Sequence, residues 1–128
     1  MKYIPFEEET PEIKTRVEDY WTERAESFFE QKQLELESEK ADKWLREILG
    51  RISEAFEGRE ASQINILDVV CGAGFFTVLI GREGFNVTGI DLTKEMVEKA
   101  EQMIMLCGPF KADVRAMDMD AENLDFQD

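Results

Sequence analysis

Apolar residues recur at intervals of three and four through the first half of the chain, from Pro11 to about Phe56, with charged residues between them. This spacing places the apolar side chains on one face and predicts amphipathic helix. The charged stretch ELESEKADK, residues 35–43, interrupts the apolar series and favours two helices over one continuous helix. Gly58, in the polar segment FEGREASQ, predicts the end of the second helix. The first apolar series is Ile13, Val17, Tyr20, Trp21, Ala25, Phe28 and Phe29.

The second half of the chain alternates between short apolar runs and helical periodicity. INILDVV (64–70) is an almost uninterrupted β-branched and apolar run, which predicts a strand covered on both faces, as in a parallel sheet. NVTGID (86–91) and KADVRAM (111–117) predict two further strands. Between them, an apolar helical segment stops at Gly84, and a second helix begins after Thr93, a candidate N-cap, and ends at the segment CGP (107–109). This order favours right-handed βαβ crossovers and an α/β fold with a parallel sheet.

Composition narrows the chemistry of this fold. The 128 residues include 29 acidic and 15 basic side chains, a formal net charge of −14, and 43% of them are apolar, which suffices for one domain with a core. Such an acidic chain without a basic stripe disfavours a nucleic-acid partner and an acidic membrane surface. Because the chain has no histidine, it cannot form a Ser-His-Asp triad or a His-liganded metal site, and we expect no metal.

Two cysteines, Cys71 and Cys107, lie inside otherwise regular patterns and do not form a disulfide framework. This indicates a reducing compartment. The acidic, proline-broken N-terminus is unlike a signal peptide, and no run of 18 apolar residues is present. We therefore expect a cytoplasmic location.

Gly72 and Gly74 follow the first predicted strand and give a ligand room to approach the backbone. Asp91 ends the second predicted strand, where a carboxylate can accept hydrogen bonds from a ribose diol. Each feature also has a purely structural interpretation, as a tight turn and as a helix N-cap. Together and in this order they favour a nucleoside site. Thr77 replaces the third glycine of the G-x-G-x-x-G fingerprint, which speaks against a nicotinamide dinucleotide.

These segments resemble the motifs of class I S-adenosylmethionine-dependent methyltransferases. ILDVVCGAGFFTVLIGREGFNVTGIDLTKEMVEKA (66–100) is similar to the family's D-x-G-C-G-x-G motif and to the D-L-S-x-x-M form that closes its second strand. MDAENLDFQD (119–128) is similar to the segment after the third strand, commonly G-D-A-E-N-L-P-F. The resemblance covers residues 64–128 and extends more loosely into the first helix through YWTERAESF (20–28). It implies a Rossmann-like parallel sheet in residues 59–128, preceded by a helical lid segment in residues 1–58.

The implied function is methyl transfer from S-adenosylmethionine to a small-molecule acceptor, with S-adenosylhomocysteine as product. No catalytic residue follows from the motifs, because this reaction depends chiefly on positioning. One alternative is a non-catalytic homologue that binds the cofactor, its product or a partner. A more remote alternative is the half-domain of a nucleotide-binding oxidoreductase.

The resemblance also assigns residues to each part of the cofactor. The methionine end would face Asp68 and the turn formed by Val70, Cys71, Gly72, Ala73 and Gly74. Asp91 would bind the ribose hydroxyls, and the adenine would contact Leu92, Met96, Asp120 and the amide of Ala121. A helical lid would bring Tyr20, Trp21 and Arg24 over the cofactor. Other interpretations stay open, since Asp68 could tie down the turn, and Leu92, Met96 and Trp21 are typical core residues.

Two features depart from the family pattern. Val70 stands where the family has its first glycine, and a β-branched residue avoids positive φ, so we expect weakened cofactor binding that Val70→Gly would tighten. The family sheet has seven strands in the order 3-2-1-4-5-7-6, whereas this chain stops just after the third strand. INILDVV would then present an open apolar edge. Either the chain is a fragment of a larger enzyme, or it is a complete short protein that closes this edge by oligomerising.

Overall fold

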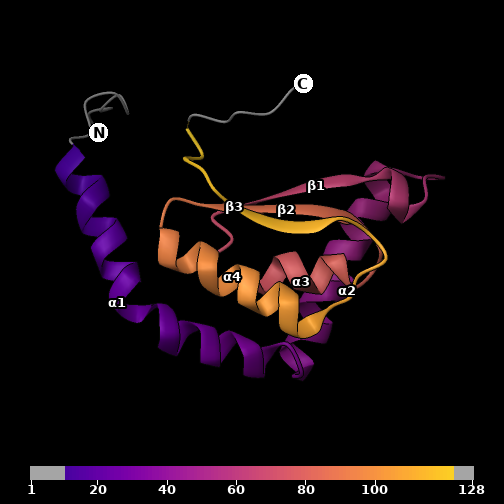
Figure 1. The fold of residues 1–128 in the computed structure, drawn as a ribbon. Helices are drawn as coiled ribbons and strands as arrows, with labels where there is room; N and C mark the ends of the chain where they lie inside the picture. The colour runs from indigo at the N-terminus through magenta and orange to yellow at the C-terminus, as the bar shows by residue number, and fades with distance from the viewer. Residues whose placement is uncertain (1–10, 123–128) are drawn as a thin grey trace, which may run out of the picture.

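The computed structural model describes residues 11–122, which form four α-helices, a short 3-10 helix and three strands (Figure 1). Two long helices come first, α1 (Pro11–Glu35) and α2 (Glu39–Ala55). The 3-10 helix η2 (Ala61–Gln63) leads into an alternation of strands and helices: β1 (Asn65–Val69), α3 (Phe75–Gly81), β2 (Asn86–Asp91), α4 (Lys94–Cys107) and β3 (Val114–Asp118). No helix within residues 11–122 combines the length and hydropathy needed to cross a bilayer.

The break between α1 and α2 confirms the prediction of two helices. Helix α1 ends at Glu35, and Ser38 is the N-cap of α2. The Ser38 hydroxyl accepts a hydrogen bond of 3.4 Å from the amide of Ala41, which satisfies one of the unpaired N–H groups of the first turn. Helix α2 ends at Ala55, and Gly58 adopts a φ of +83° in the turn that follows.

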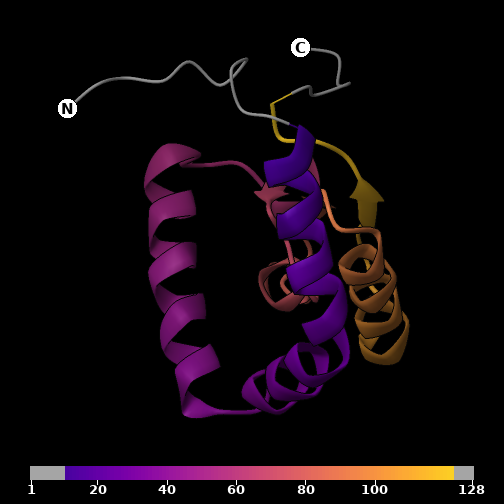
Figure 2. The same ribbon diagram turned by 90° about the vertical axis from the view of Figure 1, so that its left-hand side faces the viewer.

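The strands form a parallel sheet in the order β1-β2-β3. Asn65 of β1 pairs with Asn86 of β2, and Val87 of β2 pairs with Val114 of β3. Since both crossovers move in the same direction across the sheet, α3 and α4 lie on the same face of it (Figure 1). Figure 2 shows α1 standing in front of the sheet between α2 and α4. The predicted α/β fold with a Rossmann-like parallel sheet is confirmed.

Strand β1 corrects one expectation. The apolar run 64–70 predicts burial on both faces, but Leu67 and Val69 are 38% and 48% exposed. Ile66 and Asp68, which alternate with them, are half-buried on the face that packs against the helices. Within the described residues nothing covers the other face of β1, and β1 forms an edge of the sheet. Burial was wrongly predicted because it depends on what lies against each face as well as on the strand's own residues.

Smaller differences concern the ends of elements. Helix α3 ends at Gly81 rather than at Gly84, which has a φ of +92° in the turn before β2. Strand β3 covers Val114–Asp118 instead of residues 111–117, because pairing with β2 begins at Val114. Thr93 occupies the N-cap position of α4, but its side chain makes no capping hydrogen bond.

The core centres on α3, a helix buried on nearly all sides. The larger apolar cluster collects side chains from all four helices, and a smaller one lies beneath the start of the sheet. The larger cluster contains Phe29, Leu36, Ala41, Ala73, Phe75, Val78, Leu79 and Met103, and the smaller one contains Ile64, Ile80, Phe85 and Val87. This packing fixes α1 against the helix layer, so that its N-terminal half reaches the carboxyl ends of the strands.

Candidate functional site

A cavity of about 340 Å³ opens at the carboxyl edge of the sheet. In parallel α/β sheets ligands bind outside this edge, where loops from successive strands meet. The wall is formed by α1, the turn after β1, the end of β2, the start of α4 and the segment after β3. The lining residues are Lys14, Val17, Trp21, Phe28, Val70, Gly72, Ile90, Asp91, Leu92, Thr93, Met96, Met119, Asp120, Ala121 and Glu122.

Asp91 lies in the cavity wall and accepts hydrogen bonds from two other segments of that wall. Its side chain is buried, and its Oδ2 accepts a hydrogen bond of 3.0 Å from the amide of Gly72. Its Oδ1 accepts a bond of 2.9 Å from the amide of Thr93. One carboxylate therefore links the turn after β1 to the start of α4. Because each carboxylate oxygen has a second acceptor direction, Asp91 can also accept from a ligand hydroxyl.

The turn after β1 depends on residues with positive φ. Val70, Gly72 and Gly74 have φ values of +58°, +54° and +87°. A Cβ atom built on Gly72 would lie 3.1 Å from the ring of Phe28, so a side chain here would crowd that ring as well as strain the backbone. Val70 is the one non-glycine residue with positive φ in the described part of the chain, and its side chain is 70% exposed. A β-branched residue in this region is strained.

Asp68 and Cys71 lie at the turn after β1 but do not line the cavity. The Thr77 hydroxyl donates a 2.7 Å hydrogen bond to Asp68 Oδ2, which ties β1 to α3. Burial raises the pKa of Asp68 above its ordinary value, although the bond from Thr77 lowers it. Burial also raises the pKa of the Cys71 thiol to about 12, and the nearby carboxylates of Asp68 and Asp91 add to the effect. At neutral pH this thiol stays protonated and is not a nucleophile.

Lys14 and Asp120 connect α1 to the segment after β3. The Lys14 ammonium donates to Asp120 Oδ2 at 2.7 Å, across 106 positions of sequence, and both side chains are partly exposed. Asp120 Oδ1 accepts a second bond of 2.9 Å from the amide of Glu122. The hydrogen bond from Lys14 holds the pKa of Asp120 below its ordinary value. This ion pair lies in the cavity wall between the two elements.

The three predicted lid residues of α1 have different surroundings. Trp21 lines the cavity and meets Phe28 edge to face, with 5.5 Å between ring centroids. Tyr20 is half-exposed outside the cavity, and the Arg24 guanidinium lies 3.6 Å over its ring. Arg24 also donates to the carbonyl of Tyr20, so these two side chains form a pair on the helix surface.

The cavity brings together part of the predicted site. The predicted residues that line it are Trp21, Val70, Gly72, Asp91, Leu92, Met96, Asp120 and Ala121. The predicted residues that do not line it are Tyr20, Arg24, Asp68, Cys71, Ala73 and Gly74. The motifs missed Lys14, Val17, Phe28, Ile90, Thr93, Met119 and Glu122. Val17 and Phe28 lie on the same helical stripe as Trp21, which is the signal that could have identified them.

The segment containing these motifs matches a known family. Residues 66–128 match the family described as a methyltransferase domain. "Putative methyltransferase YqeM" of Bacillus subtilis (strain 168) is 37% identical over 68 residues, which are 53% of this chain and 24% of that protein. The 23S rRNA (uracil(1939)-C(5))-methyltransferase RlmD of Tolumonas auensis is 38% identical over 58 residues, 41% of this chain and 13% of that protein. The chain therefore matches about a quarter of these relatives' length or less.

The fold is also found in solved structures. Magnesium protoporphyrin IX methyltransferase from Synechocystis PCC 6803, crystallised with bound S-adenosylhomocysteine, superposes with a TM-score of 0.62. The match covers 88% of this chain and 53% of that one, at 17% sequence identity. At this identity the similarity establishes a common fold.

Proposed function

Residues 66–128 belong to the class I S-adenosylmethionine-dependent methyltransferases, and on this premise we propose that the cavity binds S-adenosylmethionine for methyl transfer to an acceptor. The position of Asp91 is the observation that carries the proposal. Its buried carboxylate ends the second strand, contacts the glycine turn at 3.0 Å and lines the cavity. A carboxylate at this place binds a ribose diol in nucleotide-binding α/β folds.

The remaining cavity residues suit the other parts of a nucleoside. Leu92 and Met96 offer apolar surface for a base, beside the segment that contains Asp120 and Ala121. Trp21 closes the same space from α1. We propose that Asp91 binds the ribose hydroxyls, that Leu92 and Met96 pack on the adenine, and that Asp120 and Ala121 contact its polar edge.

When bound, the cofactor supplies a methyl group on a positively charged sulfur. An acceptor atom attacks the methyl carbon in line, and the sulfur leaves as a neutral thioether. The residues of this chain bind and orient the nucleoside and shield it from water. Cys71 takes no part as a nucleophile, because its thiol is buried and protonated at neutral pH. Catalysis by positioning fits this set of residues.

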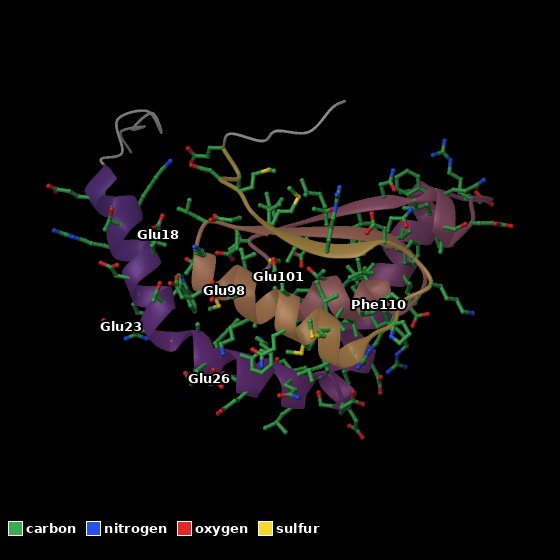
Figure 3. All side chains as sticks on the ribbon, viewed as in Figure 1. Glu18, Glu23, Glu26, Glu98, Glu101 and Phe110 are labelled. Carbon is green, nitrogen blue, oxygen red and sulfur yellow. The ribbon has the colours of Figure 1, made fainter. Side chains whose placement is uncertain are left out.

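We propose a small molecule as the acceptor. One similar protein is named for rRNA and another for a porphyrin, so similarity alone leaves the class of acceptor open. The charge of −14 favours a small molecule, because an acidic surface repels a phosphate backbone. Figure 3 places Glu18, Glu23 and Glu26 on α1 and Glu98 and Glu101 on α4, the two helices beside the cavity.

We also propose a cytoplasmic location, because the free thiols of Cys71 and Cys107 suit a reducing compartment.

We also propose that the edge strand β1 pairs with a further strand, from a second copy of the chain or from a longer form of it. Leu67 and Val69 are exposed beside a row of unpaired backbone groups, and such an edge favours strand addition. Light scattering of the 128-residue chain tests the homo-oligomer. A mass that stays monomeric at every concentration contradicts self-pairing through this edge.

Calorimetric titration with S-adenosylhomocysteine tests cofactor binding. We expect saturable binding by the wild-type chain and at least a tenfold loss of affinity in Asp91→Asn, which keeps the side chain's size but removes its charge. Asp113→Asn is the matched control, because Asp113 is exposed before β3, outside the cavity lining. Circular dichroism verifies that each variant is folded. A folded wild-type chain that binds no S-adenosylhomocysteine, or equal affinity in Asp91→Asn, overturns the proposal.

A further inference from the structure

The cavity runs from the segment after β3, past the end of β2, to the turn after β1. If Asp91 in the middle binds a ribose diol, as the proposed function states, the two ends receive different parts of the ligand. In nucleotide-binding βαβ units the group attached to the 5′ carbon extends toward the turn after the first strand. In this chain that end of the cavity is lined by Val70 and Gly72.

Val70 narrows this end of the cavity. At a φ of +58° a glycine would leave bare backbone there, but Val70 adds a branched side chain to the cavity wall. The cavity volume of about 340 Å³ is near the lower limit of about 300–1,000 Å³ found for small-molecule sites. Asp68, Cys71, Ala73 and Gly74 lie outside the lining, so the described cavity does not extend along the rest of the turn.

Three amides of the turn already donate hydrogen bonds within the chain. The amide of Cys71 donates to the Ile90 carbonyl at 2.8 Å, and the amide of Gly74 donates to the Cys71 carbonyl at 3.0 Å. The amide of Gly72 donates to Asp91. The carboxylate of an amino-acid tail could therefore bond these three N–H groups only at the expense of their present partners.

Charged side chains also line the cavity. The described lining contains the carboxylates of Asp91, Asp120 and Glu122. Lys14 is the one basic residue among them, and it donates to Asp120. Asp120 and Glu122 lie at the opposite end of the cavity from the turn, whereas Asp91 lies between the two ends. Asp91 would repel the carboxylate of an amino-acid tail and attract its ammonium, so charge gives such a tail no clear advantage.

We propose that Val70 makes the cavity selective for the nucleoside half of its ligand, so that adenine nucleosides with a short, uncharged 5′ substituent bind as well as those with an amino-acid tail. This inference rests on the proposed function. The full cofactor binds chiefly through its base and ribose, and its amino-acid tail adds little affinity. Val70 is then a specificity-determining residue for the 5′ side of the ligand.

Titration with two thioethers tests this selectivity. S-Adenosylhomocysteine carries an amino-acid tail, and 5′-methylthioadenosine is the same thioether without it. For the wild-type chain we expect dissociation constants within threefold of each other. For Val70→Gly we expect S-adenosylhomocysteine to bind at least tenfold tighter and 5′-methylthioadenosine to change by less than threefold. Val70→Ala keeps a Cβ atom but loses both methyl groups. Its affinity for S-adenosylhomocysteine should lie between those of the wild-type chain and Val70→Gly.

The outcomes separate this inference from the proposed function. A wild-type chain that prefers S-adenosylhomocysteine by tenfold or more overturns the inference alone. Equal gains for both ligands in Val70→Gly also overturn it, because Val70 would then act through the backbone rather than on the tail. If neither ligand binds wild-type or Val70→Gly chains that are folded by circular dichroism, the proposed function and this inference both fail.

Discussion

The two halves of helix α1 carry the same apolar periodicity but have different surroundings. In the C-terminal half, Ala25 and Phe29 are buried, and Phe29 belongs to the larger core cluster. In the N-terminal half, Ile13 and Val17 are 47% and 44% exposed. The C-terminal half packs on the core, whereas the N-terminal half faces the cavity and reaches the segment after β3 through the pair formed by Lys14.

This difference shows that one helical stripe can serve two purposes. A side chain that packs against α3 and α4 stabilises the fold, because burial removes it from water on all sides. A side chain that faces the cavity stays partly hydrated, so under the proposed function it should contribute more to ligand binding than to folding. Substitutions along α1 should therefore separate stability from affinity.

Phe29→Ala should give the largest effect. Removing a buried phenylalanine should lower the free energy of unfolding by about 3–4 kcal/mol, through lost burial and the cavity that remains. Urea denaturation followed by circular dichroism measures the change. Val17→Ala, on the same stripe but exposed, is the control and should cost less than about 0.5 kcal/mol. Equal losses in the two variants would show that both halves of α1 are packed alike.

Trp21→Ala should change affinity more than stability. Trp21 lines the cavity, where its ring can contact a bound nucleoside, and one aromatic contact is worth about 1 kcal/mol, which corresponds to roughly fivefold weaker nucleoside binding. Calorimetric titration with 5′-methylthioadenosine measures it. Trp44→Ala is the matched control, because Trp44 packs on Phe76 and does not line the cavity. Weaker binding in Trp44→Ala would contradict a specific role for Trp21.

Asp120→Asn should give the smallest effect, with a characteristic pH dependence. A partly exposed ion pair contributes less than about 1 kcal/mol. Because Lys14 lowers the pKa of Asp120 in the folded state, the pair stabilises the wild-type chain above the unfolded pKa of about 3.9. This stability is lost as the pH falls through the folded pKa. The difference between wild type and variant in urea denaturation should therefore disappear at low pH.

Two variants control for the loss of the Lys14–Asp120 pair. Lys14→Met should reproduce the small loss at neutral pH. Asp118→Asn removes an exposed carboxylate at the end of β3 and should leave stability unchanged. A difference between wild type and Asp120→Asn that stays constant from neutral to acidic pH would show that the ion pair does not stabilise α1.

Local signals account for what could be predicted. The run NVTGID coincides with β2, and Asp91 ends that strand as expected. The motif predicts that Val70 occupies a glycine position, and its φ of +58° is the conformation that glycine favours. The Lys14–Asp120 pair had no such signal, because its partners are separated by 106 positions. No sequence signal indicated that one face of β1 is exposed, because an apolar run has the same composition whether one face or both are covered.

The sequence by itself determined the order of helices and strands, the glycine turn and the acid at the end of β2. These depend on backbone preferences and on the periodicity of neighbouring residues, which act over a few positions. The tertiary structure alone decided which part of α1 became core and which part became cavity wall. It also decided that the Cys71, Gly72 and Gly74 amides are already bonded. These outcomes depend on contacts between distant segments, which packing of the whole chain creates.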